Sequence, residues 1–358
     1  MDLLILTGND VDEVITKFTP VDLVNLMAQV FADLAASSND ETQVSIPHRS
    51  TVVSTNHRIL FMPSRLASFG ASVKIVSVPT ANAPEDVKQR GLPGSTAVLD
   101  ERSGEVVALV NARKLTALRN AASSLLATQL MLPPSRRFPT NLVAIGAGAQ
   151  ISAHVSLFLS SYPTIITCTV FNRTNNSRLT TLIDSLKPLH PNVVFHGLPL
   201  VDEAGAEHEE LRKAIQDANI VVTATSSTSP LFPSKYVSPG AHLCLIGSYT
   251  PAMHEIDTDL VKRASKLAVD YKQGVLVEAG EVIDAGIGSE GLVELGELLE
   301  SDTAGRWVTR ENKVDDIRSG DITIFKSVGV GVQDAAISHA VVNVAKEHSI
   351  GTVIKDYC

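Results

Sequence analysis

The glycine-rich segment at residues 142–151 is the part of the chain whose residue types and spacing most clearly suggest chemistry. It reads Leu-Val-Ala-Ile-Gly-Ala-Gly-Ala-Gln-Ile, so a short apolar strand leads directly into a turn. Gly146 can adopt a turn closed to residues with a Cβ, and Gly148 lets the backbone approach a pyrophosphate at a helix N-terminus. The segment predicts a dinucleotide site. A plain α/β turn is the alternative, because Ile151 stands where the fingerprint has Gly or Ala.

A second candidate site follows the next apolar strand, at Asn172, Arg173 and Thr174. A dinucleotide fold reads the ribose of its cofactor at this position. A carboxylate there would bind the ribose hydroxyls, whereas these three side chains supply donors that suit a 2′-phosphate. The tripeptide therefore favours NADP over NAD, unless Arg173 is simply a loop arginine in solvent.

Arg119 lies early in a predicted helix, where the helix dipole disfavours a cation, and small residues follow it at 121–124. A buried anion would explain both features. A guanidinium binds carboxylate or phosphate bidentately, and small neighbours would let a ligand come close. The alternative is a surface arginine paired with a nearby acid.

Lys74 lies in a predicted strand, and strict alternation places it on the same face as Val76 and Val78. It could protect an edge strand, or extend its ammonium group to solvent. Alternatively, desolvation beside other cations would lower its pKa and suit it to proton transfer or to binding a carboxylate. Arg49, which follows Pro47-His48, is uninformative by itself.

The histidines do not have the spacing of metal ligands. The most suggestive group is His242 and His254, with Glu255 directly after the second histidine. No further ligand stands at an interval that metal sites usually have. The sequence therefore predicts no metal.

Composition indicates a globular chain that binds a small molecule. The chain has 358 residues, of which 44% are hydrophobic and 19% charged. This length and hydrophobic content are enough for two cores, so we expect two domains. The net charge of −9 argues against nucleic acid and anionic membranes as partners.

The cysteines and the apolar segments bear on the compartment. Cys168, Cys244 and Cys358 are too few and too far apart for a disulfide framework, which indicates a reducing environment. The apolar start at 3–6 is too short for a signal peptide, and no apolar stretch approaches the roughly 20 residues of a membrane span. We expect a soluble cytoplasmic protein.

Residues from about 140 to 330 alternate apolar runs with helical patterns, which predicts a doubly wound parallel sheet. The predicted strands are 142–145, 165–171, 193–195, 220–224, 242–246, 267–269 and 322–325. The predicted helices are 151–161, 178–187, 209–218 and 274–285. The polar stretch 202–210 is expected to be a loop and helix start.

The N-terminal third predicts a second domain with an antiparallel or mixed sheet. A helix is expected at 22–37, with strands at 51–54, 59–62, 73–78 and 95–100. A helix at 115–131 ends before Pro133-Pro134 and leads into a linker at 133–140. A final helix at 332–348 and a short strand at 352–355 either pack on the first domain or complete the second.

Taken together, these pieces resemble the ornithine cyclodeaminase and mu-crystallin family over nearly the whole chain. The matching stretches are Pro47-His48-Arg49, Met62-Pro63, Val73-Lys74, Gly91-Leu92-Pro93, Leu115-Thr116-Ala117-Leu118-Arg119, Ile145-Gly146-Ala147-Gly148-Ala149-Gln150, Asn172-Arg173-Thr174, Ala224-Thr225-Ser226-Ser227, Gly247-Ser248, Glu255-Ile256-Asp257 and Ser327-Val328-Gly329 with Gln333-Asp334. Their order and spacing are together quite specific.

The resemblance implies an α/β fold in which a Rossmann doubly wound parallel sheet, residues 133–330, is inserted in a mixed α+β domain. That domain, residues 1–132 plus 331–358, would bind substrate and form a homodimer. Arg49, Lys74 and Arg119 would gather around the carboxylate and amino end of an α-amino or α-imino acid. The resemblance assigns cofactor binding to Gly146, Gly148, Ala149, Gln150, Asn172, Arg173, Thr174, Thr225, Ser226, Gly247, Ser327 and Gly329.

One departure bears on the reaction. Cyclodeaminases have an Asp two residues after the glycine that matches Gly247, where it handles the δ-amino group of ornithine, and this chain has Tyr249. A phenol with a pKa near 10 does not replace an ionised carboxylate. The main hypothesis is therefore an NADPH-dependent reductase of a cyclic or substituted α-imino acid, similar to the ketimine reductase branch. Lys74 would be the proton donor and Tyr249 a weaker candidate.

Two further hypotheses remain open at this point. One is ornithine cyclodeamination to proline with the cofactor recycled, or a related amino-acid dehydrogenation. The resemblance implies that bacterial cyclodeaminases use NAD, which is the less favoured cofactor for this chain. The other is a crystallin-like NADP-binding protein without turnover.

Overall fold

The computed structural model describes residues 2–37, 40, 42–89, 91–132, 138–201 and 209–357. It divides the chain into two compact units, which we call unit 1 (Met1–Arg119 with Val330–Cys358) and unit 2 (Asn120–Gly329). Most of the predicted linker at 133–140, most of the predicted loop at 202–210, and Cys358 lie outside the described residues.

Unit 1 is built on a mixed sheet. Its order over the described residues is β18-β1-β7-β6-β5-β4-β2, with β3 also paired to β4. The strands are β1 (Leu3–Leu6), β2 (Val44–Ser45), β3 (Ser50–Val53), β4 (His57–Leu66), β5 (Gly70–Pro79), β6 (Gly94–Leu99), β7 (Val106–Asn111) and β18 (Thr352–Ile354). Only β1 and β7 pair in parallel among these neighbours, and β18 pairs antiparallel with β1. An antiparallel or mixed sheet was predicted, and the sheet is mixed because of the parallel pair β1–β7, neither strand of which was predicted.

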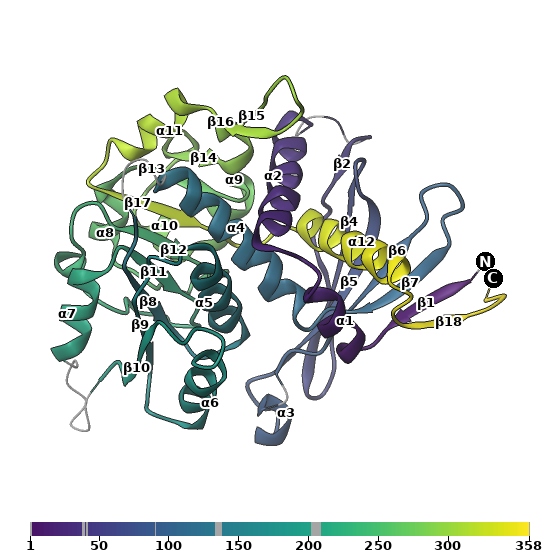
Figure 1. The fold of residues 1–358 in the computed structure, drawn as a ribbon, viewed down its shortest axis with the longest axis horizontal. Helices are drawn as coiled ribbons and strands as arrows, with labels where there is room; N and C mark the ends of the chain where they lie inside the picture. Colours follow the sequence, from purple (N-terminus) through teal and green to yellow (C-terminus); the bar gives the residue numbers. More distant parts are fainter. Residues whose placement is uncertain are drawn as a thin grey trace. The chain divides into compact units, whose positions relative to one another are not determined.

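In the part of the chain that the structure describes, unit 1 has five helical segments. They are α1 (Gly8–Ile15), α2 (Pro20–Ala36), α3 (Glu85–Gln89), the first turn of α4 (Leu115–Met131) and α12 (Gly331–Glu347). Of these, α1, α2 and α12 contact the sheet. In Figure 1, α12 runs across the strands β4 to β7, and it also contacts α2. α2 begins where Thr19 and Asp22 form a capping box and Pro20 fixes the first turn. The last long helix is therefore part of the same unit as the N-terminal residues.

Unit 2 contains the predicted doubly wound parallel sheet, in the order β10-β9-β8-β11-β12-β17-β13-β14. Its strands are β8 (Asn141–Ile145), β9 (Thr167–Asn172), β10 (Val194–Pro199), β11 (Ile220–Thr223), β12 (His242–Leu245), β13 (Ala264–Val269), β14 (Leu292–Glu294) and β17 (Ile322–Lys326). All the pairs are parallel. The strands β11, β12 and β17 are buried throughout, as expected for a sheet covered on both faces.

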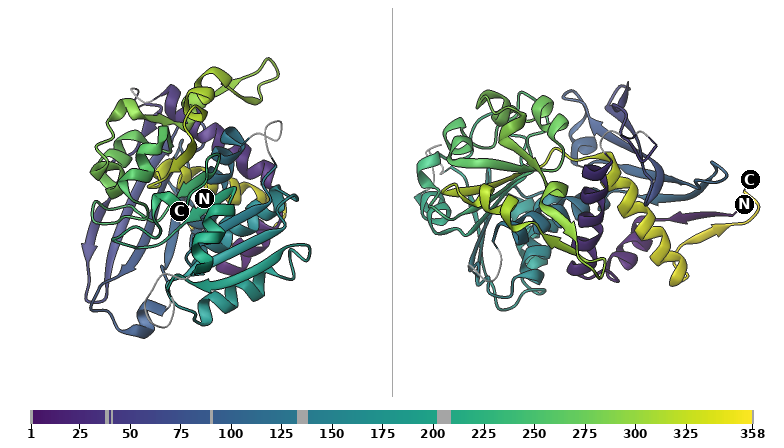
Figure 2. Two further views of the ribbon diagram at one scale, coloured as in Figure 1. Left: turned by 90° about the vertical axis from the view of Figure 1, so that its left-hand side faces the viewer. Right: turned by 90° about the horizontal axis from the view of Figure 1, so that it is seen from above.

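Helices lie on both faces of this sheet (Figure 2). They are the rest of α4, α5 (Ala149–Ser161), α6 (Ser177–Leu186), α7 (Glu209–Asp217), α8 (Thr258–Arg263), α9 (Lys272–Glu278), α10 (Gly280–Asp284) and α11 (Glu311–Arg318). Short 3-10 turns occur at Ser234–Tyr236, Ser289–Gly291 and Leu295–Leu298, and β15 (Leu299–Ser301) pairs with β16 (Trp307–Thr309).

One helix prediction was wrong. The single helix expected at 274–285 is two helices, because the backbone is extended at Ala279. A Cβ on Gly280 would lie 2.3 Å from the carbonyl oxygen of Met253, so the chain changes direction where another backbone segment comes very close.

Candidate functional site

The glycine turn of unit 2 has a geometry that only glycine permits. Gly146 has φ of +122°, and a Cβ there would lie 2.8 Å from the carbonyl oxygen of Ala224. Its N–H donates to the carbonyl oxygen of Phe171 at 2.7 Å. The turn is thereby fixed between the ends of three strands, β8, β9 and β11.

Gly148 leaves the start of helix α5 open to an anion. It is the N-cap residue of α5 and provides no side-chain hydrogen bond, so N–H groups of the first turn keep their donors for another acceptor. A Cβ on Gly148 would meet no protein atom within 4 Å. Ile151 is fully buried, with its Cγ1 3.2 Å from where a Cβ on Gly146 would lie, so the missing side chain of Gly146 leaves room for it.

A pocket of about 750 Å³ opens at the carboxyl ends of β8, β9 and β11, and we call it the glycine-turn pocket. In doubly wound folds this is where ligands bind, and the volume suits a small-molecule site. Of the predicted cofactor residues, it is lined by Gly146, Gly148, Asn172, Arg173, Thr174, Thr225 and Ser226. Ala149 instead lines a second, adjoining groove with Gly148. Gln150, Gly247, Ser327 and Gly329 are not among the lining residues.

Two arginines line the glycine-turn pocket without an internal carboxylate partner. Asn172 Nδ2 donates to the carbonyl oxygen of Thr174 at 3.0 Å, which shapes the loop that carries Arg173. Arg173 and Arg178 are both exposed, and within the described residues neither forms an ion pair. Both guanidinium groups therefore remain available to an anion in the pocket.

The wall of the glycine-turn pocket is held by a buried carboxylate, Glu255. Its Oε1 accepts from the N–H of Thr225 at 2.7 Å and from the Thr225 hydroxyl at 2.9 Å. Its Oε2 accepts from the N–H of Gly247 at 2.7 Å and from the Thr223 hydroxyl at 2.8 Å. Burial raises the pKa of Glu255, and the positive charge of Lys326 and these hydrogen bonds act in the opposite direction. Gly247 is required, because a Cβ would lie 2.4 Å from Glu255 Oε1.

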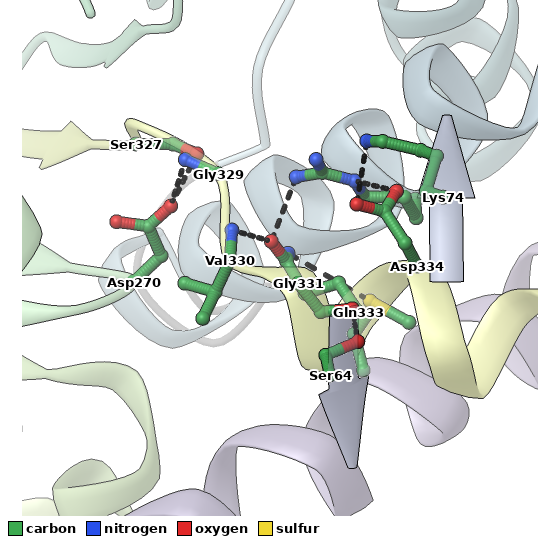
Figure 3. A network of polar contacts seen from close by, with 11 residues as sticks. Ser64, Lys74, Asp270, Ser327, Gly329, Val330, Gly331, Gln333 and Asp334 are labelled. Atoms are coloured by element: carbon green, nitrogen blue, oxygen red, sulfur yellow. Dashed lines mark hydrogen bonds and ion pairs between the residues drawn. The ribbon is translucent and has the colours of Figure 1, made fainter. Parts of the chain in front are cut away.

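A second buried carboxylate, Asp270, organises the segment that contains two predicted cofactor residues. Its Oδ2 accepts from the Ser327 hydroxyl at 2.7 Å and from the N–H of Gly329 at 2.7 Å (Figure 3). The N–H of Val328 also donates to it, at 3.1 Å. Gly329 has φ of +83°, a left-handed conformation that favours glycine.

In unit 1, Lys74 is buried in the middle of the sheet. It lies on β5 between β4 and β6, so the alternative of an edge-strand lysine is wrong. The residue is only 4% exposed. Its ammonium group donates to Asp334 Oδ2 at 2.5 Å, and Figure 3 shows the side chain reaching from its strand to this carboxylate on helix α12.

Arg119 meets the same carboxylate. Its Nε donates to Asp334 Oδ1 at 3.2 Å, and its Nη1 donates to Gln333 Oε1 at 2.7 Å. With 3% of the residue exposed, the alternative of a surface arginine is wrong. The anion that the structure places beside Arg119 belongs to the protein itself, and a contact to a substrate carboxylate stays a prediction.

The charges of this group, which we call the Lys74–Asp334–Arg119 cluster, act on one another. Burial lowers the pKa of Lys74, Asp334 raises it, and Arg119 and Arg49 lower it further. Burial opposes ionisation of Asp334, but Arg119 and Lys74 together hold the pKa of its carboxyl below the usual range. Arg49 is exposed, in the segment before β3. The three predicted cations therefore influence one region of unit 1.

Tyr249 lies in unit 2 and is 40% exposed. The three residues of the suggestive histidine group have separate partners. His242 Nδ1 is 2.8 Å from the Thr323 hydroxyl, His254 pairs with Asp284, and Glu255 holds the pocket wall as described. Among the described residues, no group of three or more His, Cys, Asp or Glu side chains could hold a metal ion.

Cys168 and Cys244 are free, buried thiols. Burial raises the pKa of each to about 12, so neither is a ready nucleophile. None of the helices in the described part of the chain is long and apolar enough to cross a membrane.

Sequence reasoning missed the carboxylates as site residues. Asp334, Glu255 and Asp270 are each fully or almost fully buried. Glu255 and Asp334 fall in stretches that match the family, but an acid at the start of a helix or in a loop has an ordinary explanation in capping. Asp334 lies in the first turn of α12, where an acid is expected in any helix, so its position alone did not mark it as a site residue.

Comparisons with known proteins agree with this architecture. The model of the ornithine cyclodeaminase/mu-crystallin family matches residues 9–349. The Delta(1)-pyrroline-2-carboxylate reductase of Bacillus cereus is 27% identical over 347 residues, which cover 93% of this chain and 97% of that protein. The ketimine reductase mu-crystallin of Macropus fuliginosus is 27% identical over 317 residues, or 85% and 87% of the two chains.

A solved structure is similar over almost the whole length. It is the Delta(1)-pyrroline-2-carboxylate reductase of Thermococcus litoralis in complex with NADH and L-proline. The TM-score is 0.77 with 25% sequence identity, and the match covers 98% of this chain and 99% of that one.

Proposed function

Because the chain belongs to the ornithine cyclodeaminase/mu-crystallin family, we propose that it is an NAD(P)H-dependent reductase of a cyclic or substituted α-imino acid. The observation that carries the proposal is the buried Lys74–Asp334–Arg119 cluster, with two cations around one internal carboxylate. Relatives that span nearly the whole chain are named as reductases of imino acids, which supports the same reaction class. We assign substrate binding to unit 1 and dinucleotide binding to unit 2.

The residues of unit 2 fit a dinucleotide cofactor. The open N-terminus of α5 and the space beside Gly148 suit a pyrophosphate, and Gly146, Ala149 and Gln150 complete this turn. Thr225, Ser226, Gly247, Ser327 and Gly329 would hold the rest of the molecule. When bound, the reduced cofactor supplies a hydride.

We propose NADPH as the preferred cofactor. Arg173 and Arg178 line the glycine-turn pocket with no carboxylate partner in the described residues, and a 2′-phosphate would pair with them. Asn172 and Thr174 add further polar groups to this part of the pocket. NADH is the alternative, supported by its presence in the structure of the T. litoralis relative.

In unit 1, we assign the substrate carboxylate to Arg49, Arg119 and Lys74. With Asp334 ionised, the cluster plus Arg49 carries more positive than negative charge, which suits an anionic ligand. Fixing the carboxylate fixes the adjacent C=N carbon as well, so positioning contributes a large part of the rate.

The imine nitrogen must gain a proton as its carbon gains a hydride. Lys74 is the best placed acid of the cluster, and its pKa is already lowered by burial and by the neighbouring arginines. Tyr249 is a weaker candidate, because it is 40% exposed and is not among the residues that line the glycine-turn pocket.

Two alternatives are separated by simple assays. Ornithine cyclodeamination is disfavoured because Tyr249 stands where cyclodeaminases have an Asp, and release of ammonia and proline from ornithine with catalytic NAD would establish it. A crystallin-like protein would bind NADPH tightly and turn over no imino or amino acid.

The deciding experiment is a cofactor and imine panel. Purified protein is incubated with NADPH or NADH and either pyrroline-2-carboxylate or piperideine-2-carboxylate, and absorbance of the reduced cofactor is followed. Loss of absorbance with at least one imine is expected, and no loss with either would contradict the proposal. The homodimer that the family resemblance implies is tested in parallel by light scattering after gel filtration.

A further inference from the structure

Asp334 divides its carboxylate between two cations. Oδ2 accepts from Lys74 at 2.5 Å and Oδ1 from Arg119 Nε at 3.2 Å, and the residue is 2% exposed. Both contacts are charge-assisted and come from different elements, β5 and α4. The carboxylate therefore fixes where the two cationic groups lie relative to each other.

The first turn of α12 is itself held at several points. Gln333 Oε1 accepts from the N–H of Val330 at 2.9 Å and from Arg119 Nη1 at 2.7 Å. The Ser64 hydroxyl on β4 donates to the carbonyl oxygen of Gly331 at 2.8 Å (Figure 3). Asp334 thus projects from a rigid turn, which limits how far its carboxylate can move.

The charged groups that act on Lys74 come from several elements around it, and its register partner on β4 is the uncharged Met62. Asp334 faces it from α12, Arg119 from α4 and Arg49 from the segment before β3. On the neighbouring strand β6, Thr96 pairs with Lys74 in register, and its buried hydroxyl has no hydrogen-bond partner among the described residues. Burial and both arginines favour the neutral amine, and Asp334 is the anion among these groups that favours the ammonium.

We propose that Asp334 is the positioning residue of the proton donor, holding Lys74 charged and directed while it keeps Arg119 in place for the substrate carboxylate. This inference rests on the proposed imino-acid reduction. Asp334 acts through Lys74 and Arg119 and need not touch the substrate.

The arrangement also accounts for the state after proton transfer. Lys74 gives one proton to the imine nitrogen, the C=N carbon receives a hydride from NADPH, and the products are the amino acid, NADP⁺ and a neutral Lys74 amine. Asp334 then still pairs with Arg119, so no buried carboxylate is left without a cation. The Lys74 amine recovers its proton from solvent, which completes the cycle.

The first test measures Lys74 directly and does not depend on turnover. The titration midpoint of its ammonium group is followed by NMR with isotope-labelled lysine, and the Lys74→Met variant identifies the signal. Asp334→Asn keeps the shape of the side chain and removes its charge, and we expect the midpoint to fall by about one pH unit or more. Asp284→Asn, which removes an exposed carboxylate paired with His254, is the matched control. A midpoint that moves by less than about 0.3 pH units in Asp334→Asn would overturn the inference.

The second test uses the pH profile of kcat/KM. In Asp334→Asn the loss of activity at high pH should begin at lower pH, and activity should be largely kept at low pH. Asp334→Glu keeps the charge and should return the high-pH limb toward its wild-type position. A structural role alone would lower kcat at every pH and leave the limb unmoved, which would contradict the inference.

The outcomes separate the inference from the proposed function. Wild-type protein that reduces no imine contradicts the proposed function, while the NMR midpoint still decides the role of Asp334. If Asp334→Asn does not fold, the wild-type midpoint decides, because a Lys74 ammonium that loses its proton below about pH 7 is not held charged by Asp334.

Discussion

Buried carboxylates in the two units are satisfied in different ways. In unit 1, Asp334 is paired with two cations, Lys74 and Arg119. In unit 2, Glu255 and Asp270 accept mainly from backbone N–H groups and hydroxyls. A third buried carboxylate of unit 2, Glu281, pairs instead with the buried Lys326 at 3.1 Å. Asp334 therefore acts on the charge of its partners, whereas Glu255 and Asp270 act on the position of loops.

The difference matters because the two kinds of partner respond differently to change. A carboxylate shifts the protonation equilibrium of a neighbouring cation. It only holds an N–H donor in place. Removing the charge of Asp334 should therefore change acid–base behaviour. Removing an acceptor from Glu255 should change stability and the shape of the glycine-turn pocket.

The largest expected effect is on turnover, through Lys74→Ala. Loss of the proposed acid should lower kcat about 100-fold or more, while the affinity for NADPH stays close to wild type because Lys74 belongs to unit 1. Steady-state kinetics and a cofactor titration measure the two quantities. Lys355→Ala, which removes an exposed ammonium paired with Asp2, should change neither. Turnover above a tenth of the wild-type value would exclude Lys74 as the principal acid.

A second prediction concerns stability at acid pH. The unfolding free energy of unit 2 should fall more with decreasing pH than that of unit 1. Burial lowers the pKa of His154 to about 4 and of His242 to about 3, so both are neutral in the folded protein at pH values where the unfolded chain binds protons. Their contribution is complete well above pH 6.5 and is lost as the pH falls toward the folded values. At pH 5.5 each histidine should therefore lower the unfolding free energy by about 1.4 kcal/mol relative to neutral pH. The pKa of Asp334 is below its usual range, so its pairs in unit 1 persist under these conditions.

Urea unfolding at pH 7.5 and pH 5.5 checks this, with fluorescence of Trp307, the single tryptophan of the chain, as a probe in unit 2. His242→Gln should reduce the pH dependence, and the exposed His48→Gln should leave it unchanged. Equal pH dependence in all three proteins would show that the buried histidines do not control acid sensitivity.

A third prediction tests the carboxylate of unit 2. Glu255→Gln replaces one acceptor oxygen by an amide that faces donors such as the Thr225 or Gly247 N–H, which should lower the unfolding free energy by about 2 kcal/mol. Affinity for NADPH should fall as well, because Thr225 lines the glycine-turn pocket. Urea unfolding and cofactor fluorescence measure both. Glu300→Gln, at an exposed side chain, is the control, and a similar loss there would remove the special role of Glu255.

The smallest predicted effect concerns cofactor choice. Arg173→Ala removes an exposed cation of the glycine-turn pocket and should weaken NADPH binding about tenfold, or about 1.4 kcal/mol, with NADH little affected. Dissociation constants for both cofactors give the answer, with Arg102→Ala in unit 1 as the control. Equal weakening of NADPH and NADH would argue against a 2′-phosphate contact.

Much of the fold could be predicted from local sequence. The strands of unit 2 follow apolar runs, and helix α4 occupies the residues expected for it, because burial on both faces and helical periodicity are written in neighbouring residues. β14 and the β15–β16 pair were missed, since each strand has three residues and too few positions to show alternation.

The site was predictable only in part. The glycine turn was evident because the turn needs a residue with a positive φ, and Gly146 can adopt it. Lys74 and Arg119 were recognised as unusual from their own positions, but each kept an ordinary alternative until its partner was known. Asp334 gave no comparable signal, since an acid in the first turn of a helix is favoured by the helix dipole in any protein.

The sequence by itself therefore determined the fold class, the glycine turn and the types of charge available to a site. Only the tertiary structure decided which of those charges meet. Lys74 and Asp334 are 260 residues apart in the chain and 2.5 Å apart in space. Local conformation depends on neighbouring residues, whereas the pairing of these buried charges depends on how the sheet of unit 1 and helix α12 pack together. The physical reason is that an ionised group stays in the interior only where the fold brings it a partner.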